Sequence, residues 1–214
     1  MKKGLGIFAK QPIPGRVKTR LTPPLSQQQA CDFYRTSLQE TVTAMSGDFD
    51  AVLFYDGDRD WFTAHFPGIA LVPQEGDDLG ERMAAALQRL QRGCDACALI
   101  GSDSPDLPTT LVEKAFAALD DAPGGGVAVI PSSDGGYVLI GERGHHPQLF
   151  RDIPWSTSQV LPMTRDRAGE LAIDFREIGE WQDVDDLASL KSFLERSPQS
   201  HTARFARVHF AALL

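Results

Sequence analysis

The sequence of 214 residues has few cysteines and lacks any long apolar run. Cys31, Cys94 and Cys97 are too few and too unevenly spaced for a disulfide framework, so we expect the protein to be located in the reducing cytoplasm. Cys94 and Cys97 form a CxxC pair without a second pair at zinc-finger spacing, and we expect structural thiols. The sequence has no run of about 18 apolar residues, so it does not predict a membrane span. The apolar segment 5–9 is short and predicts a first strand, not a signal peptide.

Positive charge is also scarce, with 21 Lys and Arg against 29 Asp and Glu and a formal net charge of −8. This excess of negative charge disfavours nonspecific binding to nucleic acid polymers and to anionic lipid surfaces. The Lys and Arg residues are unevenly distributed along the chain: six of them precede the first acidic residue, Asp32. They are Lys2, Lys3, Lys10, Arg16, Lys18 and Arg20. A basic N-terminal segment in an otherwise acidic protein favours binding of a small anionic ligand over binding of a polyanion.

The pattern of apolar residues predicts an α/β fold. Hydrophobic residues make up 42% and charged residues 23% of the chain, as in globular domains. Apolar runs alternate with segments of helical periodicity, which is typical of a mostly parallel sheet flanked by helices. Strands are predicted at 4–9, 51–55, 69–72, 96–100, 127–131, 137–140 and 175–178. Helices are predicted at 26–45, 79–90, 108–119, 158–169 and 186–194, and near the C-terminus. The first of them is predicted to begin with a capping box, because Gln29 follows Ser26 by three residues. We expect one domain over residues 1–195 and a tail or helix over 196–214 that packs on it, with docking or a homodimer contact as alternatives.

The segment FAKQPIPGRVKTRL directly follows the first predicted strand. Its prolines and Gly15 predict a loop, and α/β folds bind ligands beyond the carboxyl ends of such strands. In an extended segment Arg16, Lys18 and Arg20 would share one side, where they could bind a pyrophosphate. A Walker A loop is excluded, because Val17 and Pro12 stand where that motif needs glycine. The alternative is a solvated basic loop.

Two acidic segments could supply metal ligands. In GSDSPDLP, Asp103 stands at the end of a buried strand, and Asp106 has the pattern of a turn residue. In EWQDVDDLASL, Asp183 and Asp185 precede a helix. Carboxylates are suited to Mg²⁺ or Mn²⁺ bound against substrate phosphates. In each segment helix capping is the alternative role.

Two further segments could approach a ligand. In SSDGGYVLIG, Gly135 and Gly136 permit close backbone approach, and Asp134 could bind a hydroxyl group. A plain turn is the alternative. In PQEGDDLGERM, the helix that begins near Gly80 offers amide groups to an anion or a base carbonyl, with Arg82 as an added cation.

Taken together, the motifs resemble a bacterial family of small glycosyltransferase-like proteins. The blocks are FAKQPIPGRVKTRL, PQEGDDLGERMAAAL, IGSDSPDLP, DGGYVLIG, IPWST and QDVDDLASL, in this order between residues 4 and 194. That family is associated with radical-SAM genes and, in some members, with arsenosugar biosynthesis. Its fold resembles a compact nucleotide-diphospho-sugar transferase (GT-A, Rossmann-like) fold, with molybdenum-cofactor and phospholactate guanylyltransferases as distant relatives.

The resemblance implies a nucleotide site and a divalent ion. Arg16, Lys18 and Arg20 would lie near the phosphates, and Gln74 and Gly80 near the base. The predicted nucleotide site comprises Lys10, Gly15, Arg16, Lys18, Arg20, Gln74, Gly80, Arg82, Ser102, Gly135, Gly136 and Tyr137. The implied metal ligands for Mg²⁺ or Mn²⁺ are Asp103 and Asp185. Two departures are Ser104, where the family commonly has cysteine, and Ser189, which replaces an acid behind the second ligand.

Three functions remain open at this level. The leading hypothesis is glycosyl transfer from a nucleotide sugar to a small-molecule acceptor, with Asp103, Lys18 and Arg20 stabilising the departing diphosphate and Asp134 or Asp106 as base. The alternative is nucleotidyl transfer from an NTP to a phosphorylated small molecule, with release of pyrophosphate. The third is a nucleotide-binding protein without turnover.

Overall fold

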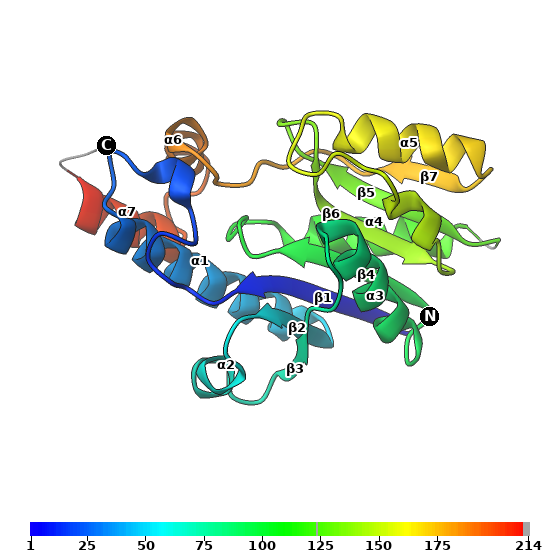
Figure 1. Ribbon diagram of the computed structural model, residues 1–214, viewed down its shortest axis with the longest axis horizontal. Coiled ribbons are helices and arrows are strands. Elements are labelled where there is room, and N and C mark those ends of the chain that lie inside the picture. Colours follow the sequence, from blue (N-terminus) through cyan, green and yellow to red (C-terminus); the bar gives the residue numbers. More distant parts are fainter. Residues whose placement is uncertain (123, 212–214) are drawn as a thin grey trace.

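A computed structural model gives the structure of the protein and describes residues 1–122 and 124–211. A seven-stranded sheet has the order β3-β2-β1-β4-β6-β5-β7 (Figure 1). Strand β6 runs antiparallel to β4 and β5, and the other pairs are parallel. The strands are β1 (Lys3–Lys10), β2 (Ala51–Asp56), β3 (Ala70–Pro73), β4 (Ala96–Gly101), β5 (Gly126–Pro131), β6 (Tyr137–Arg143) and β7 (Asp174–Glu177). The predicted mostly parallel α/β sheet is confirmed.

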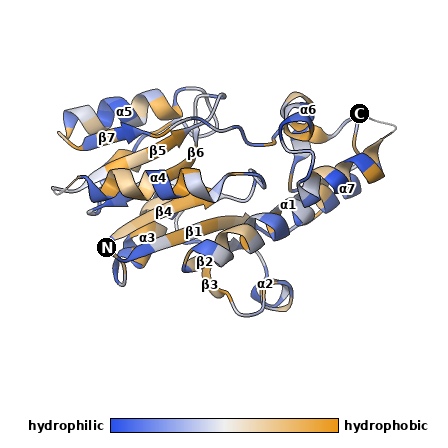
Figure 2. Cartoon of the chain, turned by 180° about the vertical axis from the view of Figure 1, so that it is seen from behind, coloured by the Kyte–Doolittle hydropathy of each residue, from blue (hydrophilic) through white to orange (hydrophobic). Residues whose placement is uncertain are grey.

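Helices cover both faces of this sheet. They are α1 (Gln27–Asp48), α2 (Arg59–His65), α3 (Leu79–Gln91), α4 (Thr109–Asp120), α5 (Val160–Glu170), α6 (Leu187–Arg196) and α7 (His201–Phe210), with short 3₁₀ turns at Thr19–Leu21 and Pro147–Phe150. One hydrophobic cluster joins the sheet to α1, α2 and α4, and a second joins it to α3 and α5. Accordingly α3 lies in front of the strands in Figure 1, and α4 lies in front in the reverse view of Figure 2.

The sequence pattern located nearly all of these elements. Residues Ala96–Ile100 of β4 are buried, as expected for a central strand covered on both faces. At the start of α1, Ser26 Oγ accepts from the amide of Gln29, and Gln29 Oε1 accepts from the amide of Ser26, which confirms the predicted capping box. Helix α2 was not predicted. It has only seven residues and buries one side chain fully, Phe62, so no recurring apolar stripe reveals it.

A third hydrophobic cluster lies beyond the sheet, where α6 and α7 pack on the first half of α1. Its aromatic side chains Phe33, Phe193 and Phe210 are fully buried. Figure 1 shows α6, α7 and this part of α1 grouped at one end of the molecule. The C-terminal helix therefore packs on its own chain, as expected, while the last three residues of the predicted tail, 212–214, lie outside the described residues.

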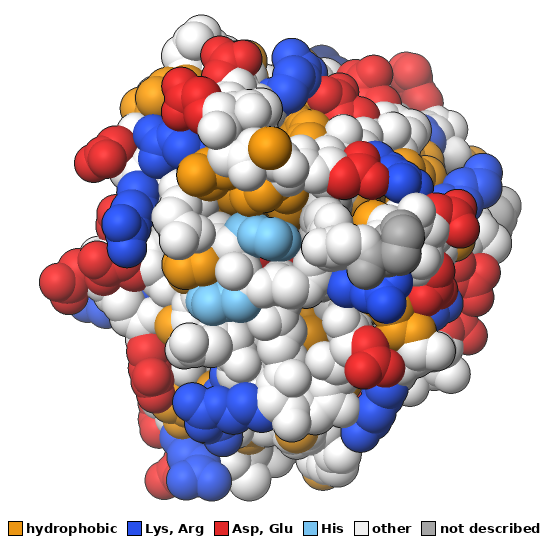
Figure 3. All heavy atoms as spheres, turned by 90° about the vertical axis from the view of Figure 1, so that its right-hand side faces the viewer, with side chains coloured by type: hydrophobic (Ala, Val, Ile, Leu, Met, Phe, Trp, Pro, Cys, Tyr) orange, Lys and Arg blue, Asp and Glu red, His pale blue; other side chains and the backbone are white. Residues whose placement is uncertain are grey.

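The outer surface carries both signs of charge. On the face seen in Figure 3, acidic and basic side chains are interspersed. Among the described residues, no helix has the length and apolar character needed to cross a membrane.

The carboxylate of Glu40 fixes α7 to α1. It accepts from Ser200 Oγ at 2.8 Å, from the amide of His201 at 2.8 Å and from the amide of Thr202 at 2.7 Å. A negative charge at a helix N-terminus is favourable, because the first amides have no partner within the helix. We expect Glu40→Ala to lower the free energy of unfolding by about 1–3 kcal/mol. Urea denaturation checks this, with Gln39→Ala as the control on the same helix, and equal stability of the two variants would contradict the role of Glu40.

Candidate active site

A cavity of about 750 Å³ opens beyond the carboxyl ends of β1 and β4. Segments far apart in the sequence line it: Tyr34 of α1 and residues within the segments 8–10, 16–20, 74–83, 99–104, 134–140, 155–160 and 183–185. This is the edge of the sheet where α/β folds bind their ligands.

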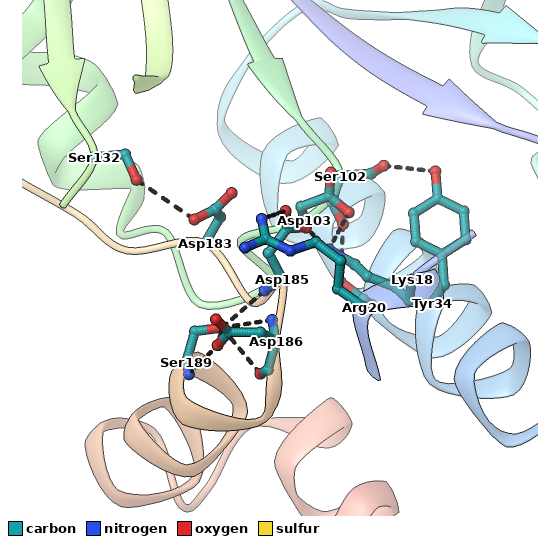
Figure 4. A network of polar contacts seen from close by, with 11 residues as sticks. Lys18, Arg20, Tyr34, Ser102, Asp103, Ser132, Asp183, Asp185, Asp186 and Ser189 are labelled. Atoms are coloured by element: carbon teal, nitrogen blue, oxygen red, sulfur yellow. Dashed lines mark hydrogen bonds and ion pairs between the residues drawn. The ribbon is translucent and has the colours of Figure 1, made fainter. Parts of the chain in front are cut away.

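An ion-pair cluster around Lys18 lines the cavity (Figure 4). Lys18 Nζ lies 2.6 Å from Asp103 Oδ1 and 3.1 Å from Asp185 Oδ1. Arg20 Nη1 lies 3.5 Å from the other oxygen of Asp185. The Lys18 side chain is only 3% exposed, whereas Asp103 and Asp185 are 41% and 43% exposed. The cationic loop and the two aspartates thus meet at one point.

Three local features bring these groups together. Lys18 has left-handed backbone angles, with φ of 48°, just before the 3₁₀ turn at Thr19–Leu21. The amide of Val184 donates to the carbonyl of Asp103 at 3.0 Å, which joins the segment before α6 to the end of β4. Ser189 Oγ accepts from the amide of Asp185 at 2.9 Å. The Ser189 hydroxyl group therefore holds the backbone of Asp185 in place. It stands where the glycosyltransferase-like family that the sequence resembles has an acidic residue.

Burial and opposite charge determine the protonation of this cluster. Burial alone lowers the pKa of Lys18, but Asp103 and Asp185 outweigh it, so the pKa of Lys18 is raised above its ordinary value and the ammonium stays charged. Burial and the neighbouring Asp185 raise the pKa of Asp183 to about 6. Asp183 also accepts from Ser132 Oγ at 3.4 Å. The sequence offers Asp183 as a candidate carboxylate in the second acidic segment, whereas the predicted metal ligands are Asp103 and Asp185.

Tyr34 is a residue of this site that the sequence did not reveal, because its spacing assigned it to the core face of α1. Its hydroxyl accepts from the amide of Lys10 at 2.9 Å and lies 2.9 Å from Ser102 Oγ. Burial raises the pKa of Tyr34, so the phenol stays neutral. Ser37 Oγ donates to the carbonyl of Ser102 at 2.8 Å. Helix α1 thus holds the ends of β1 and β4 in place.

Most of the predicted residues line the cavity. They are Lys10, Arg16, Lys18, Arg20, Gln74, Arg82, Ser102, Asp103, Asp134, Gly136, Tyr137 and Asp185. Gln74 donates through Nε2 to the carbonyls of Ala9 and Phe54, at 3.3 and 3.0 Å. Arg82 Nη1 lies 3.2 Å from Asp56 Oδ2.

Three predicted glycines do not line the cavity: Gly15, Gly80 and Gly135. A Cβ at Gly80 would collide with the carbonyl of Phe150 and with the indole of Trp155, so this glycine permits close packing at the start of α3. Gly135 has φ of +89° and lies against the backbone of Ser158.

Asp106 does not line the cavity and belongs to the scaffold. Its side chain is 5% exposed and accepts from Arg196 Nε at 2.7 Å and from Ser197 Oγ at 2.6 Å. It also accepts from Trp181 Nε1 at 3.3 Å. These contacts tie the end of α6 to the loop after β4. Asp106 is therefore a turn residue and not a base. Asp134 lines the cavity and accepts from the amide of Gly136 at 2.9 Å.

The same cluster indicates how a divalent ion would fit. Asp103 and Asp185 each direct one oxygen at a single cation, the Lys18 ammonium. Within residues 1–122 and 124–211, no group of three or more His, Cys, Asp or Glu side chains could hold a metal ion. Mg²⁺ commonly binds through one or two carboxylates together with substrate phosphates and water. The two aspartates fit that pattern, provided that Lys18 shifts toward the phosphates.

Comparisons with known proteins agree with the fold. The model of the family described as "Uncharacterized protein conserved in bacteria (DUF2064)" matches residues 39–157. A structure from Desulfovibrio desulfuricans G20, provisionally assigned as a nucleotide-diphospho-sugar transferase, is similar with a TM-score of 0.89 and 32% identity, over 99% of this chain and 96% of that one. No curated protein sequence matches the chain.

More distant structures share the fold alone. CMP:2-keto-3-deoxy-manno-octonic acid synthetase, solved with CTP, has a TM-score of 0.58 and 14% identity, over 93% of this chain and 99% of that one. A cytidylyltransferase from Leptospira borgpetersenii has a TM-score of 0.55 and 13% identity, over 92% of this chain and 87% of that one. The predicted nucleotide-diphospho-sugar transferase fold is confirmed.

Proposed function

We propose that this protein, which belongs to the DUF2064 family, is a metal-dependent glycosyltransferase that uses a nucleotide-activated sugar. The broader assignment as a nucleotide-sugar or nucleotidyl transferase is supported by the similar protein from Desulfovibrio desulfuricans. The observation that carries the proposal is the convergence of Lys18, Asp103 and Asp185 in one cavity. The narrower family associated with radical-SAM genes stays a prediction.

The side chains of the cavity can hold a diphosphate at a defined place. Lys18 is buried, and Arg16 and Arg20 line the same cavity, so phosphate oxygens that enter would meet three cations. Electrostatic stabilisation of a leaving diphosphate is a large contribution to catalysis in a preorganised site. Mg²⁺ or Mn²⁺ held by Asp103 and Asp185 would add Lewis-acid stabilisation of the same charge.

Asp134 is the proposed base. The acceptor hydroxyl oxygen forms a bond to the anomeric carbon of the sugar, and its proton passes to the Asp134 carboxylate. The bond from the anomeric carbon to the nucleoside diphosphate breaks, and its electron pair leaves on the phosphate oxygen. Asp134 is exposed and held by the amide of Gly136, which keeps its carboxylate beside the cavity.

Product analysis tests the reaction class. We expect the protein with Mn²⁺ to release a free nucleoside diphosphate from at least one of the UDP-, GDP- and CDP-linked sugars, and Asp134→Asn to slow release by about 10²-fold or more. Chromatography of nucleotides and a pyrophosphate assay measure both products. Release of pyrophosphate from an NTP would instead support the nucleotidyltransferase. Tight nucleotide binding without metal dependence and without either product would support a binding protein.

A further inference from the structure

The cavity has a second, apolar half that the phosphate chemistry does not use. Its lining includes Leu99 and Ile140, which are paired across β4 and β6, with Tyr137, Val160 and Trp155 beside them. Leu99 and Ile140 belong to the hydrophobic cluster between the sheet and helices α3 and α5, and Tyr137 and Trp155 pack against that cluster. This half therefore lies on the α3 and α5 face of the sheet. Its walls are mainly apolar, and among the described residues the buried Tyr137 hydroxyl and the Trp155 indole nitrogen have no hydrogen-bond partner, so the half suits a ligand body that is mainly apolar.

Trp155 is held over this half by a strained loop. Asp152 and Ser156 on either side of it have φ of 55° and 64°, a left-handed conformation that is uncommon for residues other than glycine. Such residues cost about 1–3 kcal/mol each and persist where the surroundings fix them, often at ligand sites. The indole packs against Gly80 at the start of α3. The loop is the IPWST block of the sequence, to which no phosphate or metal role has been given.

Charge restricts which ligand can enter beside this half. Asp134 and Asp183 line the cavity together with Asp103 and Asp185. The cations of the lining are placed elsewhere: Lys18 is paired with Asp103 and Asp185, Arg20 with Asp185 and Arg82 with Asp56, while Lys10 ends β1 and Arg16 lies in the loop after it, on the side proposed for the phosphates. Bringing a like charge against these carboxylates costs free energy in a partly desolvated site. A phosphorylated or carboxylated acceptor would meet this repulsion. A neutral acceptor would not.

We propose that the apolar half is the acceptor subsite and that the acceptor is a neutral alcohol with an apolar, ring-sized body. The body lies against Trp155, Tyr137 and the Leu99–Ile140 pair, and its hydroxyl group is directed to Asp134. This inference rests on the proposed glycosyl transfer and names the substrate class of the same site. It also disfavours the nucleotidyl reaction in the form predicted from the sequence, in which the acceptor is phosphorylated.

Three small probes separate the possible ligand classes in ligand-observed NMR titrations of the wild-type protein. They are 2-phenylethanol, phenyl phosphate, which has the same ring with a negative group, and glycerol, a neutral polyol without an apolar body. We expect 2-phenylethanol to bind, phenyl phosphate to bind about tenfold more weakly or not at all, and glycerol to show no binding. Phenyl phosphate binding as tightly as 2-phenylethanol would overturn the proposal.

Variants of Trp155 test whether the acceptor binds in the apolar half of the cavity. Trp155→Leu should weaken 2-phenylethanol about fivefold or more, Trp155→Phe should restore most of the binding, and both should leave nucleoside diphosphate affinity within about twofold. Trp61→Leu is the matched control, because Trp61 is also half-buried but stacks on His65 in α2, outside the cavity lining. Equal weakening of nucleosides and 2-phenylethanol by Trp155→Leu would assign this half to the base and overturn the acceptor subsite.

The outcomes also distinguish this inference from the proposed function. Nucleoside diphosphate binding and release without any binding of 2-phenylethanol would overturn the acceptor subsite alone. Absence of nucleotide binding and of both reaction products would overturn the proposed function, whatever the alcohol does.

Discussion

Replacing Asp103 by asparagine is expected to reduce turnover by about 10²–10³-fold, the loss found when one group that stabilises developing charge is removed. The substitution keeps the shape of the side chain and removes its charge. Asp103 is the group closest to the Lys18 ammonium, at 2.6 Å, and it is one of the two proposed metal ligands. Steady-state release of nucleoside diphosphate measures the effect.

The same variant should remain folded but lose stability. Lys18 is buried and keeps Asp185 as a partner at 3.1 Å, so the ammonium is not left alone. Because Asp103 is 41% exposed, water replaces part of the lost interaction, and we expect the free energy of unfolding to fall by about 1–3 kcal/mol. Asp166→Asn on the exposed side of α5 removes the same charge outside the cavity and serves as the control. Wild-type turnover in a folded Asp103→Asn protein would remove Asp103 from the mechanism.

Replacing Lys18 by methionine is expected to weaken nucleoside diphosphates by about 10–100-fold while leaving nucleosides unchanged. Methionine fills much of the same buried volume but cannot pair with phosphate oxygens. A hydrogen bond to a charged group is worth about 1.5–3 kcal/mol, which corresponds to this range of affinities. Isothermal titration with UDP, GDP and the matching nucleosides measures the difference. Equal weakening of both ligand types would count against a phosphate role.

The Lys18→Met variant should also bind Mn²⁺ more tightly than the wild-type protein in the absence of nucleotide. In the wild-type protein the ammonium already neutralises the two carboxylates, Asp103 and Asp185, that would bind the ion. Removing it takes away the cation beside Asp103 and leaves Asp185 with Arg20 at 3.5 Å, so the negative charge of the pair is compensated less. Electron paramagnetic resonance of free Mn²⁺ gives the affinity directly, and Lys114→Met on the surface of α4 removes an equal charge as the control. Mn²⁺ affinity that is unchanged in Lys18→Met would show that the lysine does not share the position of the ion.

The sequence by itself determined the elements of this fold and one half of the candidate site. Apolar runs and helical stripes report burial locally, so within the described residues they located all seven strands and six of the seven helices, including the capping box at Ser26. The cluster of cations directly after β1 indicated a site for a small anion, because the carboxyl end of a strand is fixed once the strand is known. Helix α2 was not predicted, because a helix of seven residues with one fully buried side chain shows no apolar periodicity.

Only the tertiary structure decided which of these residues meet. Asp103 and Asp185 are 82 positions apart in the numbering, and the amide of Val184 bonding to the carbonyl of Asp103 is what places them on the same ammonium. The difference between Asp106 and Asp134 is likewise tertiary: the first is covered by Arg196 and the second faces the cavity. Aromatic side chains such as Tyr34 and Trp155 carry no sequence signal for a site, and only the folded structure shows that they line the cavity. Local propensity acts over a few residues, whereas a site is made by contacts between distant segments, and those contacts depend on how the whole sheet and its helices pack.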